Sequence, residues 1–113
     1  MENEDRWILS YDVDGRDRVT SVRVSQLIFG RKNSTTRGGS HTTYEQPGFI
    51  HRPGVVWVGQ SVLILPRNDA FELQDRLERL GASVGLGPLL IDVANLETFR
   101  RRRRHGPRRS APS

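Results

Sequence analysis

The chain has no cysteine and only one lysine among its 113 residues. The absence of cysteine excludes a disulfide framework, a thiolate zinc site, an iron–sulfur cluster and a cysteine nucleophile. It also suits a reducing compartment, and we expect a cytoplasmic protein. No apolar run approaches the roughly 18 residues that would span a bilayer, so we expect no membrane partner. The acidic residues 1–5 predict neither a secretory signal nor a transit peptide.

The net charge of +5 comes almost entirely from arginine and is unevenly spread along the chain. Residues 1–15 and 68–99 each carry −4, whereas residues 16–67 carry +6. Residues 100–113 contain seven arginines and no acid. The length and this pattern predict one folded domain, residues 1–99, followed by a disordered basic tail, residues 100–113.

The first half of the domain predicts a strand followed by a helix. Residues 7–13 are rich in aromatic and β-branched side chains and stop at a turn-forming Asp-Gly pair. Residues 17–29 predict a helix that Asp17 caps and Gly30 ends. The side chains that follow helical spacing within it are Val19, Val22, Gln26 and Phe29.

The second half predicts a hairpin, a helix and a last strand. Two apolar runs flank Gly59-Gln60, a pair typical of a type II′ hairpin turn. Asn68 is the expected cap of a helix over residues 68–80, which Gly81 ends. Residues 84–93 contain Gly and Pro, which favour either an edge strand or a late start of the strand. Residues 94–99 add a short helical turn. Ala70, Leu73, Leu77 and Leu80 form an apolar stripe of the helix. We expect its three leucines to be buried against Ile8, Val62 and Ile64.

Strand, helix, two hairpin strands, helix and strand together make a βαββαβ order. The fold class predicted from this order is α+β and ferredoxin-like. In such a fold an antiparallel sheet is covered on one face by two helices. The other face of the sheet is left for solvent, a ligand or a second subunit.

The arginine-rich tail is the strongest functional signal in the sequence. Consecutive guanidinium groups repel one another, and phosphates relieve this repulsion while counterions are released. The tail therefore predicts binding to nucleic acid. The alternatives are a merely solubilising tail, a membrane-binding tail and an address signal. The expected contact residues are Arg100, Arg101, Arg102, Arg103, Arg104, Arg108 and Arg109.

Residues 31–53 show no periodicity and predict a long basic loop. Cations can follow a nucleic-acid backbone, and aromatic rings can stack on its bases. The expected nucleic-acid-binding residues of the loop are Arg31, Lys32, Arg37, Tyr44 and Arg52. A polar insertion without function is the alternative for this loop.

Two carboxylates close the first predicted strand. Asp12 and Asp14 are two residues apart, and on a strand end their oxygens could hold Mg²⁺. Such an ion could polarise a phosphodiester, which would make Asp12 a catalytic candidate. The alternative is ordinary turn and capping chemistry.

The chain resembles the small CRISPR-associated nuclease-like subunit of the spacer-integration complex. The resemblance covers about residues 7–92 and rests on Tyr11-Asp12-Val13, on an Arg- and Val-containing helix, and on Gly-Gln-Ser-Val at 59–62. It implies a ferredoxin-like fold, a homodimer formed through the sheets, and binding to duplex DNA. It also implies metal-dependent nuclease activity in some members, with Asp12 as the matching aspartate.

Three functions are compatible with these features. The leading one is a non-enzymatic protein that binds RNA or DNA without a cofactor, alone or docked on a larger ribonucleoprotein such as the ribosome. The second is a Mg²⁺-dependent nuclease or DNA-integration subunit that uses Asp12 and Asp14. The third is an interaction module whose acidic 68–99 surface docks a basic partner.

Overall fold

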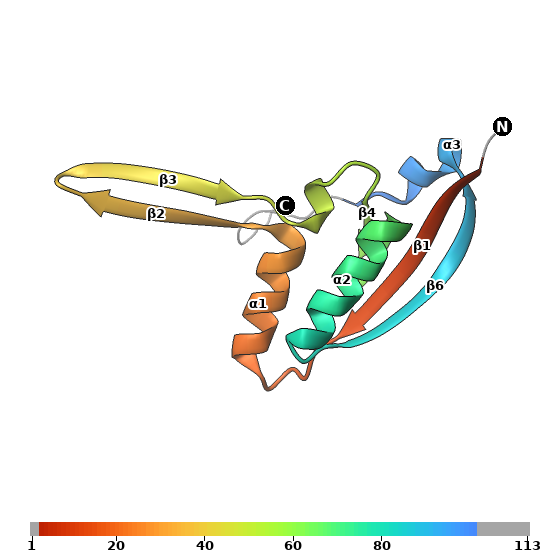
Figure 1. Cartoon of the computed structure of the whole chain (residues 1–113), viewed down its shortest axis with the longest axis horizontal. Helices are drawn as coiled ribbons and strands as arrows, with labels where there is room; N and C mark the ends of the chain where they lie inside the picture. Colours follow the sequence, from red (N-terminus) through yellow and green to blue (C-terminus); the bar gives the residue numbers. More distant parts are fainter. Residues whose placement is uncertain (1–2, 102–113) are drawn as a thin grey trace, which may run out of the picture.

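The structure, a computed structural model, describes the backbone of residues 3–101 and all their side chains except those of residues 3–4, 33–37 and 40–44. Four strands form an antiparallel sheet in the order β4-β5-β1-β6. They are β1 (Asn3–Asp12), β4 (Val56–Gly59), β5 (Val62–Pro66) and β6 (Ser83–Asp92). Helices α1 (Arg18–Phe29) and α2 (Arg67–Arg79) lie on one side of this sheet (Figure 1). The predicted α+β class and antiparallel sheet are confirmed, and the arrangement is compatible with a ferredoxin-like fold.

The two sheet edges follow from local sequence. β6 pairs with β1 along its whole length and has no partner on its outer side within the described chain. The expected edge position of this Gly- and Pro-containing strand is therefore confirmed. In the β4–β5 hairpin Gly59 pairs with Val62, so the turn residues are Gln60 and Ser61, one position later than predicted. The register of the hairpin also shifts between Trp57 and Gly59.

Helix α1 begins and ends as predicted. The carboxylate of Asp17 accepts a 3.0 Å hydrogen bond from the backbone N–H of Thr20. Val24 and Ile28 are buried, whereas Val19 and Val22 are 63% and 54% exposed. The helically spaced Val19 and Val22 therefore lie outside the core, and Val24 and Ile28 form the inner face of the helix. Both sets have helical spacing, and only the neighbouring elements decide which one is covered.

Helix α2 starts one residue before the predicted position. Pro66 ends β5 and is also the N-cap, so Asn68 lies inside the first turn and is not the predicted cap. The C-terminus is as expected, because Gly81 adopts a φ of 102°. The N–H of Ala82 donates to the carbonyl of Leu77, and that of Gly81 donates to the carbonyl of Glu78, a Schellman motif.

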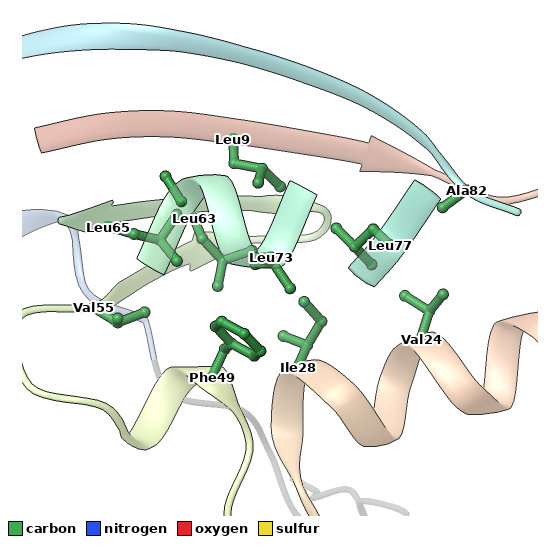
Figure 2. Packing of buried hydrophobic residues seen from close by; sticks show 11 residues of the cluster. Leu9, Val24, Ile28, Phe49, Val55, Leu63, Leu65, Leu73, Leu77 and Ala82 are labelled. Carbon is green, nitrogen blue, oxygen red and sulfur yellow. The ribbon is translucent and has the colours of Figure 1, made fainter. Parts of the chain in front are cut away.

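The main core lies between the helices and one face of the sheet (Figure 2). Leu73 and Leu77 are fully buried there, as expected, while Leu80 is only partly buried. The other members of this cluster are Leu9, Val24, Ile28, Phe49, Val55, Leu63, Leu65, Ala70 and Ala82.

The expected partners of the α2 stripe were wrong by one residue. Ile8 is 37% exposed, and Ile64 belongs to a second cluster with Val56 and Leu96. Successive strand residues point to opposite faces, and Ile8-Leu9 and Leu63-Ile64-Leu65 are apolar at every position. The sequence therefore did not reveal which residues face the helices.

The segment after β6 returns across the second face of the sheet. It contains α3 (Val93–Leu96) and the 3₁₀ turn η2 (Glu97–Phe99), which confirms the predicted short helical turn. Leu96 is buried in the second cluster, and the N–H of Arg101 donates a 2.8 Å bond to the carbonyl of Trp57 on β4. The predicted disorder of residues 102–113 lies outside the described residues.

Residues 31–53 do not form the irregular loop that was predicted. They contain a two-stranded hairpin, β2 (Arg31–Arg37) and β3 (Ser40–Gln46), and a 3₁₀ turn η1 (Phe49–His51). Gly38 and Gly39 form the two-residue turn of the hairpin, with φ values of 56° and 87°. We call this hairpin the arm, because it projects away from the body (Figure 1).

None of the described helices is long and apolar enough to cross a membrane.

Candidate nucleic-acid interface

A groove of about 490 Å³ lies between α1, the C-terminal part of α2 and the base of the arm. No carboxylate is among the described residues that line it. We call it the arginine groove because five arginines line it: Arg23, Arg31, Arg52, Arg76 and Arg79. They come from four separate parts of the chain, so only the tertiary fold assembles them.

The guanidinium group of Arg52 is engaged in contacts within the fold. Its guanidinium lies 3.9 Å from the ring centroid of the buried Phe49 and donates to Asp69 at 2.9 Å and to Glu72 at 2.9 and 3.2 Å. The hydrogen bonds to Glu72, and then the single bond to Asp69, raise the pKa of Arg52. The charge that we expected to meet phosphate is thus engaged by two carboxylates, and the contacts join η1 to α2.

This contact makes stability depend on acid pH. The hydrogen bonds from Arg52 are the main cause that lowers the pKa of Glu72 from 4.5. A carboxyl group whose folded pKa is lowered stabilises the fold above its unfolded pKa, and this contribution is lost as the pH falls through the folded value. As the pH is lowered below 4.5, we expect the melting temperature to decrease. The decrease should be smaller in the Glu72→Gln variant, which lacks this carboxyl group. Glu78→Gln, a change at an exposed residue of the same helix, should retain the full acid dependence.

The other groove arginines keep more of their charge available. Arg31 is held by neutral amides, at 2.9 Å by Gln46 and at 3.5 Å by Gln26. Arg76 and Arg79 pair with Glu72 at 3.3 Å and with Asp75 at 3.1 Å, in i,i+4 pairs on half-exposed or exposed side chains. Such surface pairs contribute little energy and can exchange partners with an incoming anion.

The expected contact residues of the arm are only partly brought to this groove. Arg31 lines it, whereas Lys32 pairs with Glu45 at 3.7 Å beside it. Arg37 and Tyr44 lie on β2 and β3, but their side chains are outside the description. Phe49, by contrast, is buried and is not a ring that could stack on a base.

Sequence reasoning missed Arg23, Arg76 and Arg79. The spacing of Arg76 and Arg79 on a helix could have placed them on one face. No local signal could have placed Arg23 of α1 opposite them, because this depends on how the two helices pack.

The arginine-rich segment starts close to the arm. Arg100 pairs with Glu97 at 2.6 Å, and Arg101 is bound through its N–H to Trp57. The ring of Trp57 lies 5.2 Å from that of Phe29, the last residue of α1, which precedes the arm. The chain therefore leaves the described body near the base of the arm. The expected contacts Arg102, Arg103, Arg104, Arg108 and Arg109 lie outside the described residues.

The two aspartates of the first strand have different surroundings. Asp12 is exposed at the end of β1, and its backbone pairs with Ser83. Asp14 accepts hydrogen bonds from the side chain and the backbone N–H of Arg16, in that order of effect, and both lower its pKa. Asp14 thus stabilises the turn after β1, which was the alternative to a role as a Mg²⁺ ligand. The described residues contain no cluster of three or more potential His, Cys, Asp or Glu ligands, and the Mg²⁺ site stays a prediction.

The second face of the sheet carries an apolar hollow of about 760 Å³. Ile8, Val58, Ile64 and Phe99 are among the residues that line it. Ile8 is 37% exposed and Phe99 43%. The homodimer through this face stays a prediction of the resemblance.

The two short motifs of the resemblance are Tyr11-Asp12-Val13 at the end of β1 and residues 59–62 around the β4–β5 turn. The arm, which follows α1, lies between them in the sequence. The resemblance therefore rests on these short motifs and on a compatible fold. Comparison of the chain with protein-family models, curated proteins and solved structures finds no significant match.

Proposed function

We propose that the protein binds nucleic acid through the arginine groove, the arm and the arginine-rich segment that begins at Arg100. The observation that carries this proposal is a groove lined by five arginines and no described carboxylate. Guanidinium groups form bidentate hydrogen bonds with phosphate oxygens, and phosphate binding releases counterions. An anion-binding surface of this kind suits a phosphodiester backbone.

The extent of the basic surface favours a polymer over a small phosphorylated ligand. The basic elements are the groove, an arm with seven residues in each strand, and a segment that leaves the body near the arm's base. A single phosphate would need only one cluster of cations. Several separated clusters match the regular spacing of phosphates along RNA or DNA.

The internal ion pairs favour this function over docking of a basic partner on the acidic 68–99 region. Of the six acids in that region, four pair with arginines of the same chain: Asp69, Glu72, Asp75 and Glu97. The acidic charge of the region is thus largely compensated within the fold.

A salt titration of binding tests the groove. We expect Arg23→Gln combined with Arg79→Gln to weaken binding to RNA and DNA, because two phosphate contacts are lost. The slope of log K against log salt should become shallower by about 0.9 for each duplex contact, or about 0.7 for a single strand. Fluorescence anisotropy at several salt concentrations measures both quantities.

The matched control changes the same charge outside the groove. Arg16→Gln combined with Arg18→Gln removes two positive charges from exposed residues at the start of α1. This control should leave the slope nearly unchanged. Equal effects of the two double variants would contradict a specific role of the arginine groove.

A further inference from the structure

The arm is long and unsupported by the rest of the fold. β2 and β3 pair only with each other in the described chain, from Arg31↔Gln46 to Arg37↔Ser40. At about 3.4 Å per residue, each seven-residue strand spans roughly 24 Å. The arm points away from the helices and the sheet (Figure 1). Its shape is therefore that of a free two-stranded ribbon.

The outer part of the arm has the composition of a polar contact surface. Residues 33–44 contain no carboxylate and no aliphatic side chain, and besides the two turn glycines they are Asn, Ser, Thr, Arg, His and Tyr. A two-stranded hairpin without an apolar face is marginal by itself in water. A polar partner surface would stabilise it, and the absence of carboxylates suits a polyanion.

Close approaches of the backbone fix the base of the arm. Gly30 has a φ of 87°, and a Cβ added there would lie 2.5 Å from the carbonyl oxygen of Gln46. A Cβ at Gly48 would collide with backbone atoms of Ile28 and Gly30. Because the two chain segments touch at these glycines, the arm leaves the body next to the arginine groove, in a direction that the backbone sets.

We propose that the arm inserts into the major groove of B-form duplex DNA, an inference that rests on the proposed nucleic-acid binding. The major groove is about 12 Å wide and admits a two-stranded ribbon, whose strands lie about 4.8 Å apart. The minor groove of about 6 Å is too narrow for such a ribbon without distortion. The major groove of A-form RNA is deep and narrow, and a single strand has no groove to fill.

The register of the arm favours one face for this contact. It places Arg31, Asn33, Thr35 and Arg37 on the same face as their partners Gln46, Tyr44, Thr42 and Ser40. Arg31 and Gln46 also line the arginine groove, so this face continues from the groove to the tip. Arg, Asn and Gln are the residue types that pair with guanine and adenine edges in the major groove.

An arm-shortened variant tests the inference. Replacing residues 33–44 by Gly-Gly moves the native turn to the register pair Lys32↔Glu45 and retains the Arg31–Gln46 hydrogen bond at the base. We expect its affinity for a duplex DNA of about 25 base pairs to fall about tenfold, since several base-edge contacts are lost. The control is Arg37→Gln, which removes the same single arginine but keeps the full-length arm. For the duplex RNA and the single-stranded DNA of the same sequence, the arm-shortened variant should lose no more affinity than this control loses.

Chemical footprinting of the wild-type complex gives a readout that does not depend on folding of the variant. Dimethyl sulfate methylates guanine N7 in the major groove and adenine N3 in the minor groove. We expect the wild-type protein to slow methylation at N7 and to leave N3 unaffected. Protection confined to N3 would overturn the inference.

The outcomes separate this inference from the proposed function. Equal loss on all three nucleic acids, or no loss on duplex DNA, would overturn the major-groove contact while nucleic-acid binding itself stands. Failure of the wild-type protein to bind any of the three at low salt would overturn both.

Discussion

Deletion of residues 102–113 should weaken binding to RNA and DNA on the order of a hundredfold or more at low salt, because several phosphate contacts are lost together. The deletion removes five arginines and takes the net charge of the chain from +5 to zero. If all five contact a duplex, the slope of log K against log salt should become shallower by about 4.5. The loss should be similar for all sequences, since phosphate contacts do not discriminate between bases. Anisotropy titrations from low to physiological salt measure the affinity and the slope.

The deletion is placed so that it does not disturb the fold. It keeps the ion pair between Arg100 and Glu97 and the hydrogen bond from Arg101 to Trp57, so the melting temperature should not change. Replacing the five arginines by lysine is the matched control. This replacement should preserve most of the slope, since it retains the charge and loses only bidentate geometry. Unchanged affinity and slope in the truncated protein would show that the tail does not bind phosphate.

Leu77→Ala should lower the free energy of unfolding by about 2–5 kcal/mol. Leu77 is fully buried on α2 within the cluster that joins both helices to the sheet (Figure 2). The truncation removes apolar surface and leaves a cavity that its neighbours cannot close completely. A domain of this size has a total stability of only about 5–15 kcal/mol, so the loss should be evident in urea denaturation.

Val22→Ala is the control for this substitution. Val22 is also an apolar residue on a helix, but it is 54% exposed, and the change should stay within about 0.5 kcal/mol. A loss below about 1 kcal/mol for Leu77→Ala would contradict the burial of the α2 stripe. A large loss for Val22→Ala would mean that this face of α1 packs against something else.

The nature and order of most elements could be predicted because their signals are local. The cap at Asp17, the left-handed stop at Gly81 and the edge position of β6 each depend on residues within one turn or one strand. The arm was missed because residues 31–46 are polar at both strand faces and have no apolar alternation. Only Gly38-Gly39, with β-branched threonine pairs nearby at 35–36 and 42–43, indicated a hairpin there.

The candidate site was predictable in charge but not in position. The sequence alone showed a basic middle segment and tail, and Arg31 is indeed at the groove. It could not show that Arg52 is engaged by Asp69 and Glu72, because these partners lie 17 and 20 residues away in sequence. Nor could it place Arg23 opposite Arg79.

By itself the sequence determined the helices, the four strands of the main sheet and their order, since caps, turns and periodicity act over a few residues. It also determined the total charge and the carboxylate-free composition of residues 33–44. Only the tertiary structure decided that Leu9 rather than Ile8 faces the helices, and which arginines meet in a groove. The physical reason is that both depend on which surfaces are buried, and burial is decided by the packing of segments that are distant in the sequence.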